Sequence, residues 1–279
     1  MKLIFLHPDN CTLLTTVKSA VKKMSNPLSP EEALRYHRQL ILPEIGEEGQ
    51  VKLRNARVFL TGLGGLGSVS AYYLAAAGVG HLRLVDKDRV ELGNLNRQIL
   101  HFSDNIGETK AHSARDKLRR LNPHCRIEAL HETITWDNGE EMAGNADLIV
   151  DGTDNVETRR ILNRVSLKKG IPFVFGGVDG LTGMATTFVP GKTPCFECLF
   201  PDAMPSKAPP GVLGPLPGII AGIQALVAIK FLVGLPHGLL ESQMLYIDGA
   251  TMNLKMIHLG RNSQCRVCGA DGSQGGNVS

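Results

Sequence analysis

The chain has 279 residues, 43% of them hydrophobic and 20% charged, with a formal net charge of +3 at pH 7. This composition is typical of a soluble globular protein with a sizeable core, and the small charge gives no support for nucleic acid or a membrane surface as partner. Four of the six cysteines form two Cys-x-x-Cys pairs, which favours metal binding in a reducing, cytoplasmic compartment over disulfides.

The first part of the chain carries little functional signal. Residues 1–28 show no motif and no signal peptide, and we expect them to be an extension without a catalytic role. A helix is predicted to begin at Pro30, with Ser29 as its N-cap. It leads into a segment that contains Arg38, and a second helix is predicted from about residue 47 to residue 55.

A glycine-rich segment follows the first predicted strand, Val58–Leu60. A helix is expected to begin directly after the glycines, at about residues 68–77. The free N–H groups and dipole of such a helix N-terminus suit a phosphate. The glycines that let the backbone turn and approach a ligand are Gly62, Gly64, Gly65 and Gly67.

The second predicted strand, residues 82–86, ends on Asp86. An acid about 20 residues past the glycines is the usual position of a carboxylate that binds ribose hydroxyls. Strand, glycine loop, helix, strand and acid together predict half of a nucleotide-binding sheet. Most such units bind NAD or FAD, so an NAD-dependent oxidoreductase is the first alternative to consider.

A polar loop follows Asp86, where a dehydrogenase requires none. Ligands of open α/β sheets bind at this end of the strands. A helix opened by residues 107–110 and reaching residue 120 places Lys110 in its first turn, where a cation opposes the helix dipole. Lys110 is therefore either an anion-binding group or simply solvated. The other polar side chains of the loop are Asp88, Asn94, Arg97 and Gln98.

A further strand, predicted to begin at residue 146, ends in acids. Asp154 is expected at the same sheet edge as the glycine loop, either as a ligand-binding acid or as the N-cap of a helix over 155–169. After a strand at 172–175 the pattern changes to antiparallel strands at 184–189, 243–247 and 253–258. The fold class predicted is α/β, a doubly wound Rossmann-like, mostly parallel sheet extended by antiparallel strands. The apolar segment 218–233 is too short to span a bilayer and is predicted to be a buried helix.

The two cysteine pairs predict a metal centre. Cys195 and Cys198 are separated by 66 residues from Cys265 and Cys268. Two such pairs complete a tetrahedral site for a structural zinc ion, with no position left open for catalysis. Two independent redox pairs are the alternative, but neither pair is expected at a helix start that follows a strand. Cys11 and Cys125 are interpreted as ordinary cysteines.

Several motifs occur together in a fixed order. They are Arg35-Tyr-His-Arg-Gln39, Gly62-x-Gly-Gly-x-Gly67, Asp86-x-Asp88, Asn94-Leu-Asn-Arg-Gln98, Lys110, Asp151-Gly-Thr-Asp-Asn155 and the two cysteine pairs. Over residues 29–270 this combination closely resembles the sulfur-carrier-protein adenylyltransferases of the MoeB/ThiF family, relatives of ubiquitin-activating enzymes. The resemblance implies a homodimer that uses Mg²⁺ and ATP to convert the C-terminal Gly-Gly carboxylate of a ubiquitin-like sulfur carrier to an acyl-adenylate, with release of pyrophosphate.

The resemblance also implies a role for each residue. Arg97 and Lys110 would contact the triphosphate, and Arg38 would reach it from the other subunit. Asp154 would hold Mg²⁺, which prefers one or two carboxylates plus phosphate oxygens. The remaining nucleotide-binding positions are Gly65 in the glycine loop, Asp86 at the ribose, and Asn94 and Gln98 along the pocket.

One departure from the family pattern bears on mechanism. Lys207 stands where family members commonly have a cysteine, and residues 199–264 contain no thiol. A covalent thioester or persulfide on this loop is therefore not expected. We expect no sulfurtransferase domain in this protein, and therefore a separate sulfur donor.

The domain expectation is an extension at 1–28, an ATP-binding adenylyltransferase domain at 29–270 and a flexible tail at 271–279. Two alternatives to adenylylation stay open. They are the NAD-dependent oxidoreductase and a non-catalytic adaptor with the same fold. The identity of the carrier and of its pathway (molybdopterin, thiamine or another thiocarboxylate pathway) does not follow from the sequence.

Overall fold

The computed structural model describes residues 27–204 and 211–269. Within them, one eight-stranded sheet runs through the molecule in the order β3-β2-β1-β4-β5-β6-β7-β8. The expectations for residues 1–26, for Lys207 and for the tail lie outside the described residues. The helices are α1 Pro30–Arg35, α2 His37–Leu40, α3 Gly46–Asn55, α4 Gly65–Ala77, α5 Lys110–Leu121, α6 Gly139–Ala143, α7 Val156–Lys169, α8 Phe196–Leu199 and α9 Pro215–Val233.

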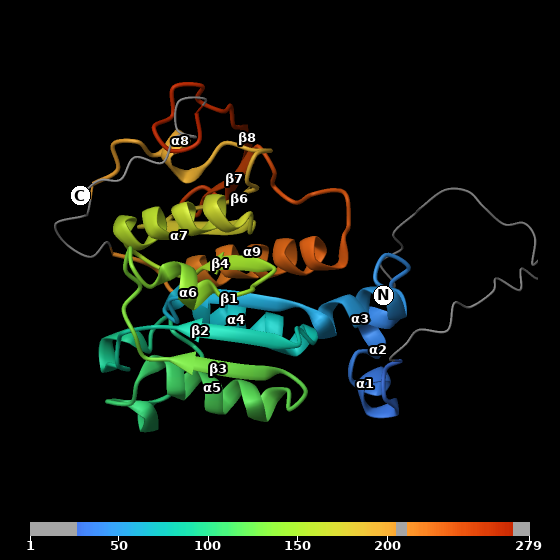
Figure 1. Cartoon of the computed structure of the whole chain (residues 1–279). Helices are drawn as coiled ribbons and strands as arrows, with labels where there is room; N and C mark the ends of the chain where they lie inside the picture. The colour runs from blue at the N-terminus through green and yellow to red at the C-terminus, as the bar shows by residue number, and fades with distance from the viewer. Residues whose placement is uncertain (1–26, 205–210, 270–279) are drawn as a thin grey trace, which may run out of the picture.

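The sheet is parallel on one side and antiparallel on the other (Figure 1). β1, β2, β3, β4 and β5 pair in parallel, and β5 through β8 pair antiparallel. This confirms the predicted fold class. The strands are β1 Arg57–Thr61, β2 His81–Val85, β3 Arg126–Leu130, β4 Leu148–Asp151, β5 Phe173–Asp179, β6 Thr182–Phe188, β7 Gln243–Asp248 and β8 Asn253–His258.

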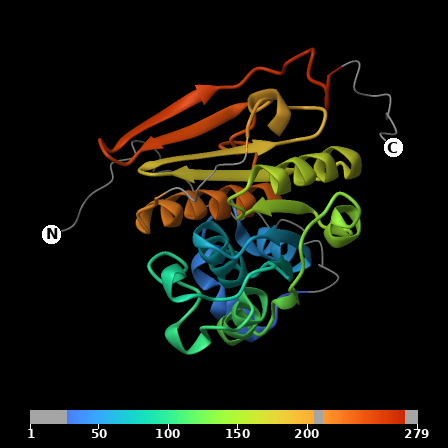
Figure 2. The ribbon, with the colours of Figure 1, turned by 90° about the vertical axis from the view of Figure 1, so that its left-hand side faces the viewer.

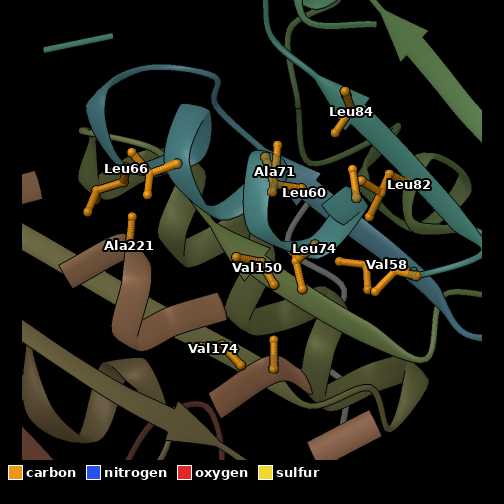
Figure 3. Close-up of a cluster of buried hydrophobic side chains, with 14 of the residues drawn as sticks. Val58, Leu60, Leu66, Ala71, Leu74, Leu82, Leu84, Val150, Val174 and Ala221 are labelled. Carbon is orange, nitrogen blue, oxygen red and sulfur yellow. The ribbon is translucent and has the colours of Figure 1, made fainter. Parts of the chain in front are cut away.

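Apolar side chains alternate between two cores because successive residues of a strand point to opposite faces. Val58 and Leu60 of β1 pack with α3, α4, α5 and α9, and Phe59 between them packs with α6, α7 and α8. Figure 3 shows the first core, where Leu74 of α4 and Ala221 of α9 lie against the strands. Figure 2 shows the antiparallel strands extending past the helices. The sheet therefore has helices on both faces along its parallel half.

Helix α9 is the one segment among the described residues that is long and apolar enough to cross a membrane, with a mean hydropathy of 2.0 over 18 residues. Half of that window is buried inside the protein. Gln224, in the middle of α9, is completely buried and donates through Nε2 to the Asp151 carbonyl oxygen at 2.7 Å. The helix begins at Pro215 and not at residue 218, so the prediction that it is too short to span a bilayer was wrong. α9 is nevertheless packed on the sheet, as predicted for a core helix.

The element boundaries differ from the prediction in two informative places. Helix α4 begins at Gly65 and not at residue 68, because the glycine-rich turn itself forms the first helical turn. Strand β5 continues past the predicted end at Phe175 to Asp179, because its glycines pair with β6 in a regular antiparallel ladder. The predicted helix start at Pro30, with Ser29 as N-cap, is confirmed, and Ser29 forms a capping box with Glu32.

Candidate nucleotide pocket and cysteine cluster

A cavity of about 390 Å³ lies at the carboxyl ends of β1, β2 and β4. Gly62, Gly64 and Gly65 line it on one side and the segment 152–155 on another. This is where an open α/β sheet binds ligands, at the point where the strand order reverses. The predicted sheet edge therefore does carry the pocket.

Glycine is required in the loop because two backbones nearly touch. A Cβ on Gly62, which has a φ of +78°, would lie 2.6 Å from the Gly152 carbonyl oxygen. A Cβ on Gly67 would lie 1.7 Å from the Gly62 carbonyl oxygen. The strand-to-helix turn is therefore tight enough to bring the N-terminus of α4 to the pocket without intervening side chains.

Asp86 is buried under the glycine loop. Its Oδ2 accepts a hydrogen bond from the Leu63 N–H at 2.6 Å and its Oδ1 accepts one from the Asp88 N–H at 2.7 Å. Burial raises the pKa of this carboxyl, and the nearby Lys110 charge and the two backbone donors oppose that rise. Asp86 lines the pocket and also holds the loop that approaches a ligand.

Lys110 is the first residue of α5, and Thr109 is the N-cap. The Lys110 side chain is only 7% exposed and its Nζ lies 3.0 Å from Asp88 Oδ2. The solvated-lysine alternative is therefore wrong. A buried cation that opposes the dipole of its helix, and whose ion-pair partner Asp88 is half-exposed, is placed to receive an anion.

Asp154 is exposed and lines the pocket. The N-cap of α7 is Asn155, whose side chain accepts a hydrogen bond from the Thr158 N–H. The helix-cap alternative for Asp154 is therefore wrong. Among the described residues nothing donates a hydrogen bond to the Asp154 carboxylate, so this carboxylate is available to a ligand.

An internal ion pair fixes the turn that presents Asp154. Asp151 is completely buried, and its carboxylate accepts hydrogen bonds from Thr153 and from Arg159 Nε at 3.0 Å. Burial raises the pKa of the Asp151 carboxyl, and the Arg159 charge opposes this. Arg159 also donates to the carbonyl oxygens of Thr153 and Gly176. The pocket wall is thus rigid on this side.

Most predicted ligand-binding positions come together in the pocket. Gly65, Asp86, Arg97, Gln98, Lys110 and Asp154 all line it. Two predicted positions lie outside the lining. Asn94 accepts a hydrogen bond from the Glu91 N–H at 3.2 Å and thereby closes a short 3-10 turn. Arg38 is an exposed residue of α2.

The sequence reasoning missed several lining residues that carry charge or hydrogen-bonding groups, among them Arg159, Glu132 and Thr133. Arg159 has a recognisable signal, since it follows the acidic turn within the first turns of α7. Glu132 and Thr133 come after β3, which was not predicted as a strand. Recognising β3 would have placed both residues at the same sheet edge as Asp86.

The four predicted metal ligands converge. The Sγ atoms of Cys195, Cys198, Cys265 and Cys268 all lie within 4.8 Å of one another, and three Sγ pairs lie at 3.9, 3.7 and 3.3 Å. A tetrahedral zinc ion with Zn–S bonds of about 2.3 Å requires Sγ atoms about 3.8 Å apart. The thiol set therefore fits one zinc ion and leaves no thiol for a second site.

One argument made against redox pairs was wrong. Cys195 is the N-cap of the short helix α8, although neither pair was expected at a helix start. The convergence of both pairs on one point, and not their position relative to helices, favours metal over two independent disulfides. Cys125 is buried apart from this cluster.

Helix α7 contacts both the pocket and the cysteine cluster. Arg160 Nε donates to Glu197 Oε1, between the two cysteines of the first pair, at 2.9 Å. Asn163 Oδ1 accepts a hydrogen bond from the Phe196 N–H at 3.0 Å. The adjacent Arg159 holds the pocket wall. The cysteine cluster therefore anchors the helix whose first turn borders the pocket.

Comparison with protein families gives a match to the ThiF family over residues 36–267. The chain belongs to the ThiF family. It is 40% identical to the sulfur carrier protein adenylyltransferase of Thermus thermophilus over 88% of this chain and 93% of that protein. It is 41% identical to the SAMP-activating enzyme E1 of Haloferax volcanii over 89% of this chain and 93% of that protein.

The chain is also similar to longer proteins and to more distant solved structures. The chain is 40% identical to the adenylyltransferase and sulfurtransferase MOCS3 of Culex quinquefasciatus, of which it spans 60%. The crystal structure of E. coli MccB with ATP superposes with a TM-score of 0.77 at 25% identity, covering 84% of this chain and 73% of MccB.

Membership of the ThiF family decides against the NAD-dependent oxidoreductase. The Thermus and Haloferax relatives, which match along most of both chains, are an adenylyltransferase and an activating enzyme by name, and this chain is an enzyme of that class. The predicted resemblance is thereby confirmed, as is the expectation of an enzyme.

Proposed function

We propose that this ThiF-family chain activates the C-terminal carboxylate of a small ubiquitin-like sulfur carrier ending in Gly-Gly, using ATP to form an acyl-adenylate and pyrophosphate. The observation that carries the proposal is the combination, in one cavity, of a glycine-rich helix N-terminus, a buried lysine ion-paired with the half-exposed Asp88, and an acid that accepts no hydrogen bond from a described residue. These groups suit a triphosphate with a metal ion.

The charges of the pocket support a role for Mg²⁺. The described lining has four cationic side chains, Lys87, Arg97, Lys110 and Arg159, and five acidic ones, Asp86, Asp88, Glu132, Asp154 and Glu157. A triphosphate brought to a lining with more acids than bases needs additional positive charge. Asp154 fits as the residue that would hold Mg²⁺, because its carboxylate is exposed and accepts no hydrogen bond from the described residues. When bound, the ion would neutralise phosphate charge.

The chain's own residues would supply the rest of the electrostatics. A carboxylate that attacks the α-phosphate is an anion approaching an anion, so the site must place cations for the transition state. Lys110 and Arg97 would hold phosphate oxygens. Asp86 would orient the ribose, with Gly65 and Gln98 along the nucleotide. The carboxylate oxygen forms a bond to the α-phosphorus while the bond to pyrophosphate breaks. The products are the mixed anhydride of the carrier carboxylate with AMP and free pyrophosphate, and no other reactant is needed.

A second subunit would complete the site. Arg38 lies outside the pocket lining of its own chain, on a short helix whose exposed neighbours include Ile41 and Leu42. An exposed arginine beside exposed apolar side chains suits a contact between subunits. We propose a homodimer in which Arg38 of each subunit reaches the triphosphate of the other. Asn94 would support the neighbouring Arg97 by closing the 3-10 turn.

The proposal also covers the metal site, the sulfur donor and the pathway. The cysteine cluster would hold a structural zinc ion, because its four thiols leave no open coordination position. The acyl-adenylate would pass to a separate sulfur donor without a covalent intermediate on the 201–210 loop. Molybdopterin, thiamine and related thiocarboxylate pathways all use such a product, and a cytoplasmic location suits the reduced cysteines.

The experiment is ATP–pyrophosphate exchange with purified chain, Mg²⁺ and a ubiquitin-like protein ending in Gly-Gly. We expect exchange that depends on the carrier and is lost when its last glycine is deleted. A non-catalytic adaptor would bind the carrier and give no exchange. Detection of carrier-AMP by mass spectrometry, with no adduct sensitive to thiols, would distinguish the non-covalent route from a covalent one.

A further inference from the structure

A single peptide carbonyl in the glycine loop is held from two directions. The Leu63 carbonyl oxygen accepts a hydrogen bond from Ser68 Oγ at 2.9 Å and lies 3.1 Å from Nε2 of His101. Leu63, Ser68 and His101 are all at least 97% buried. A loop that must approach a ligand is thus fixed from the protein interior, on the side away from the pocket.

The partners of His101 define its protonation. Lys117 Nζ can only donate, and it lies 2.7 Å from Ser113 Oγ. The Ser113 hydroxyl is therefore free to donate to His101 Nδ1, which lies 2.9 Å away. A carbonyl oxygen can only accept, so His101 Nε2 carries the proton and donates to Leu63. The hydrogen bonds run in one direction from Lys117 to Leu63.

The direction of the Leu63 carbonyl determines that of the next N–H. In a trans peptide the N–H points opposite to the C=O of the same unit, and no cis peptide bond occurs among the described residues. The Leu63 carbonyl points to His101 in the core, so the Gly64 N–H points away from it. Gly64 lines the pocket, and its N–H donates to no acceptor among the described residues.

We infer that His101 is a positioning residue that aims the Gly64 N–H at a phosphate oxygen of the bound nucleotide. This rests on the proposed function only for the identity of the anion. His101 touches no ligand. It acts through one peptide unit, and Ser113 and Lys117 keep it in the tautomer that can donate.

Burial strengthens the case for a neutral donor. Burial, together with the nearby charges of Lys117 and Lys110, lowers the pKa of His101 to about 4, and the hydrogen bond to Leu63 opposes this shift. The ring therefore stays uncharged across the range in which enzymes of the cytoplasm work. A neutral imidazole with a fixed tautomer donates one hydrogen bond in one direction.

The test has two parts. In the wild-type chain, the ¹⁵N chemical shifts of the His101 ring report the tautomer directly, and we expect Nε2 protonated and Nδ1 unprotonated. In variants, we compare ATP affinity by calorimetry for His101→Leu, which cannot donate, and His101→Gln, which can. We expect the Kd for ATP to rise about tenfold in His101→Leu, which is the effect of one misdirected hydrogen bond to a charged group. In His101→Gln we expect most of the affinity to be restored.

Ser166→Ala is the matched control. Ser166 Oγ donates to the Ile171 carbonyl oxygen at 2.6 Å, so this change also removes a buried hydroxyl–carbonyl bond, but far along α7 from the glycine loop. It should lower stability without changing ATP affinity. The opposite tautomer, or wild-type ATP affinity in folded His101→Leu, would overturn the inference. A wild-type chain that bound ATP but exchanged no pyrophosphate would count against the proposed function and leave this inference standing.

Discussion

The cysteine cluster and the candidate nucleotide pocket both contact helix α7, and they differ in what each of them requires. The cluster needs four atoms of one kind at one spacing, and any protein segment that brings four thiols within 4.8 Å satisfies it. The pocket depends on direction. Asp86 is turned toward the Leu63 N–H, Lys110 is paired with Asp88, and Asp154 accepts no hydrogen bond from a described residue.

This difference predicts whether a substitution lowers stability and metal content or lowers activity. Removing one cysteine removes a ligand and its share of folding energy, so the loss appears in stability and metal content together. Removing one pocket residue changes the charge or direction presented to a ligand, so the loss appears in activity while the fold remains. The predictions below follow that division, from the largest expected effect to the smallest.

The largest effect is expected at the metal. A structural zinc ion contributes on the order of 10 kcal/mol of apparent binding free energy at neutral pH. Cys265→Ser should therefore lose both zinc, measured by elemental analysis, and much of the thermal stability. Cys125→Ser is the control, because Cys125 is equally buried but outside the cluster, and it should keep the zinc. Less than one zinc per wild-type chain would favour redox pairs.

Asp154→Ala should have the opposite effect, a loss of activity without a loss of stability. We expect normal thermal stability and a loss of at least about 100-fold in pyrophosphate exchange, the scale for one preorganised electrostatic group. The neighbouring Asn155→Ala removes the N-cap of α7 and should cost about 1 kcal/mol of stability, with a far smaller loss of exchange. If Asp154→Ala retained exchange, Asp154 would have no part in binding the metal and triphosphate.

The third prediction concerns the shared site. Arg38→Ala and Lys110→Ala should each be inactive in exchange, because one removes a cation from the partner's triphosphate and the other from the subunit's own. After subunit exchange between the two variants, each heterodimer should regain one intact site. A mixture that stays inactive although heterodimers have formed would place Arg38 in its own subunit's site or give it a purely structural role.

The smallest effect is a pH dependence from His101. Its pKa is lowered from 6.5 to about 4 in the folded chain. Between these two pH values the unfolded state binds more protons than the folded state. The free energy of unfolding contributed above pH 6.5 is therefore lost as the pH falls, by at most about 1.4 kcal/mol per pH unit, and the loss levels off near pH 4. Denaturant unfolding of wild type and His101→Gln should show this slope in the difference between them. A difference independent of pH would mean that the ring titrates normally.

Much of the fold and the whole cysteine cluster could be predicted from the sequence, because both depend on the spacing of residue types along the chain. Apolar runs at β1, β2 and β4, the glycines and the cysteine pairs each leave a local pattern. β3, Arg126–Leu130, alternates charged and apolar residues and has no such run, so Glu132 and Thr133 after it were missed. The boundary of β5 was misjudged because glycines usually end strands, whereas here they pair with β6.

The pocket was less predictable because its roles depend on orientation. Asn94, Arg97 and Gln98 occur in one motif, yet Asn94 closes a turn while the other two line the cavity. Lys110 could have been solvated, and only its burial against Asp88 decides otherwise. His101 carries no motif, and its contact with Leu63 joins residues 38 positions apart in the chain.

The measurement that tests the account most directly is ATP–pyrophosphate exchange by the wild-type chain with Mg²⁺ and a Gly-Gly carrier. The account predicts exchange that requires the carrier's terminal carboxylate, together with carrier-AMP detected by mass spectrometry. A folded, zinc-loaded chain that binds ATP and carrier but gives neither exchange nor carrier-AMP would contradict it, and would assign this ThiF-family chain to the non-catalytic adaptors.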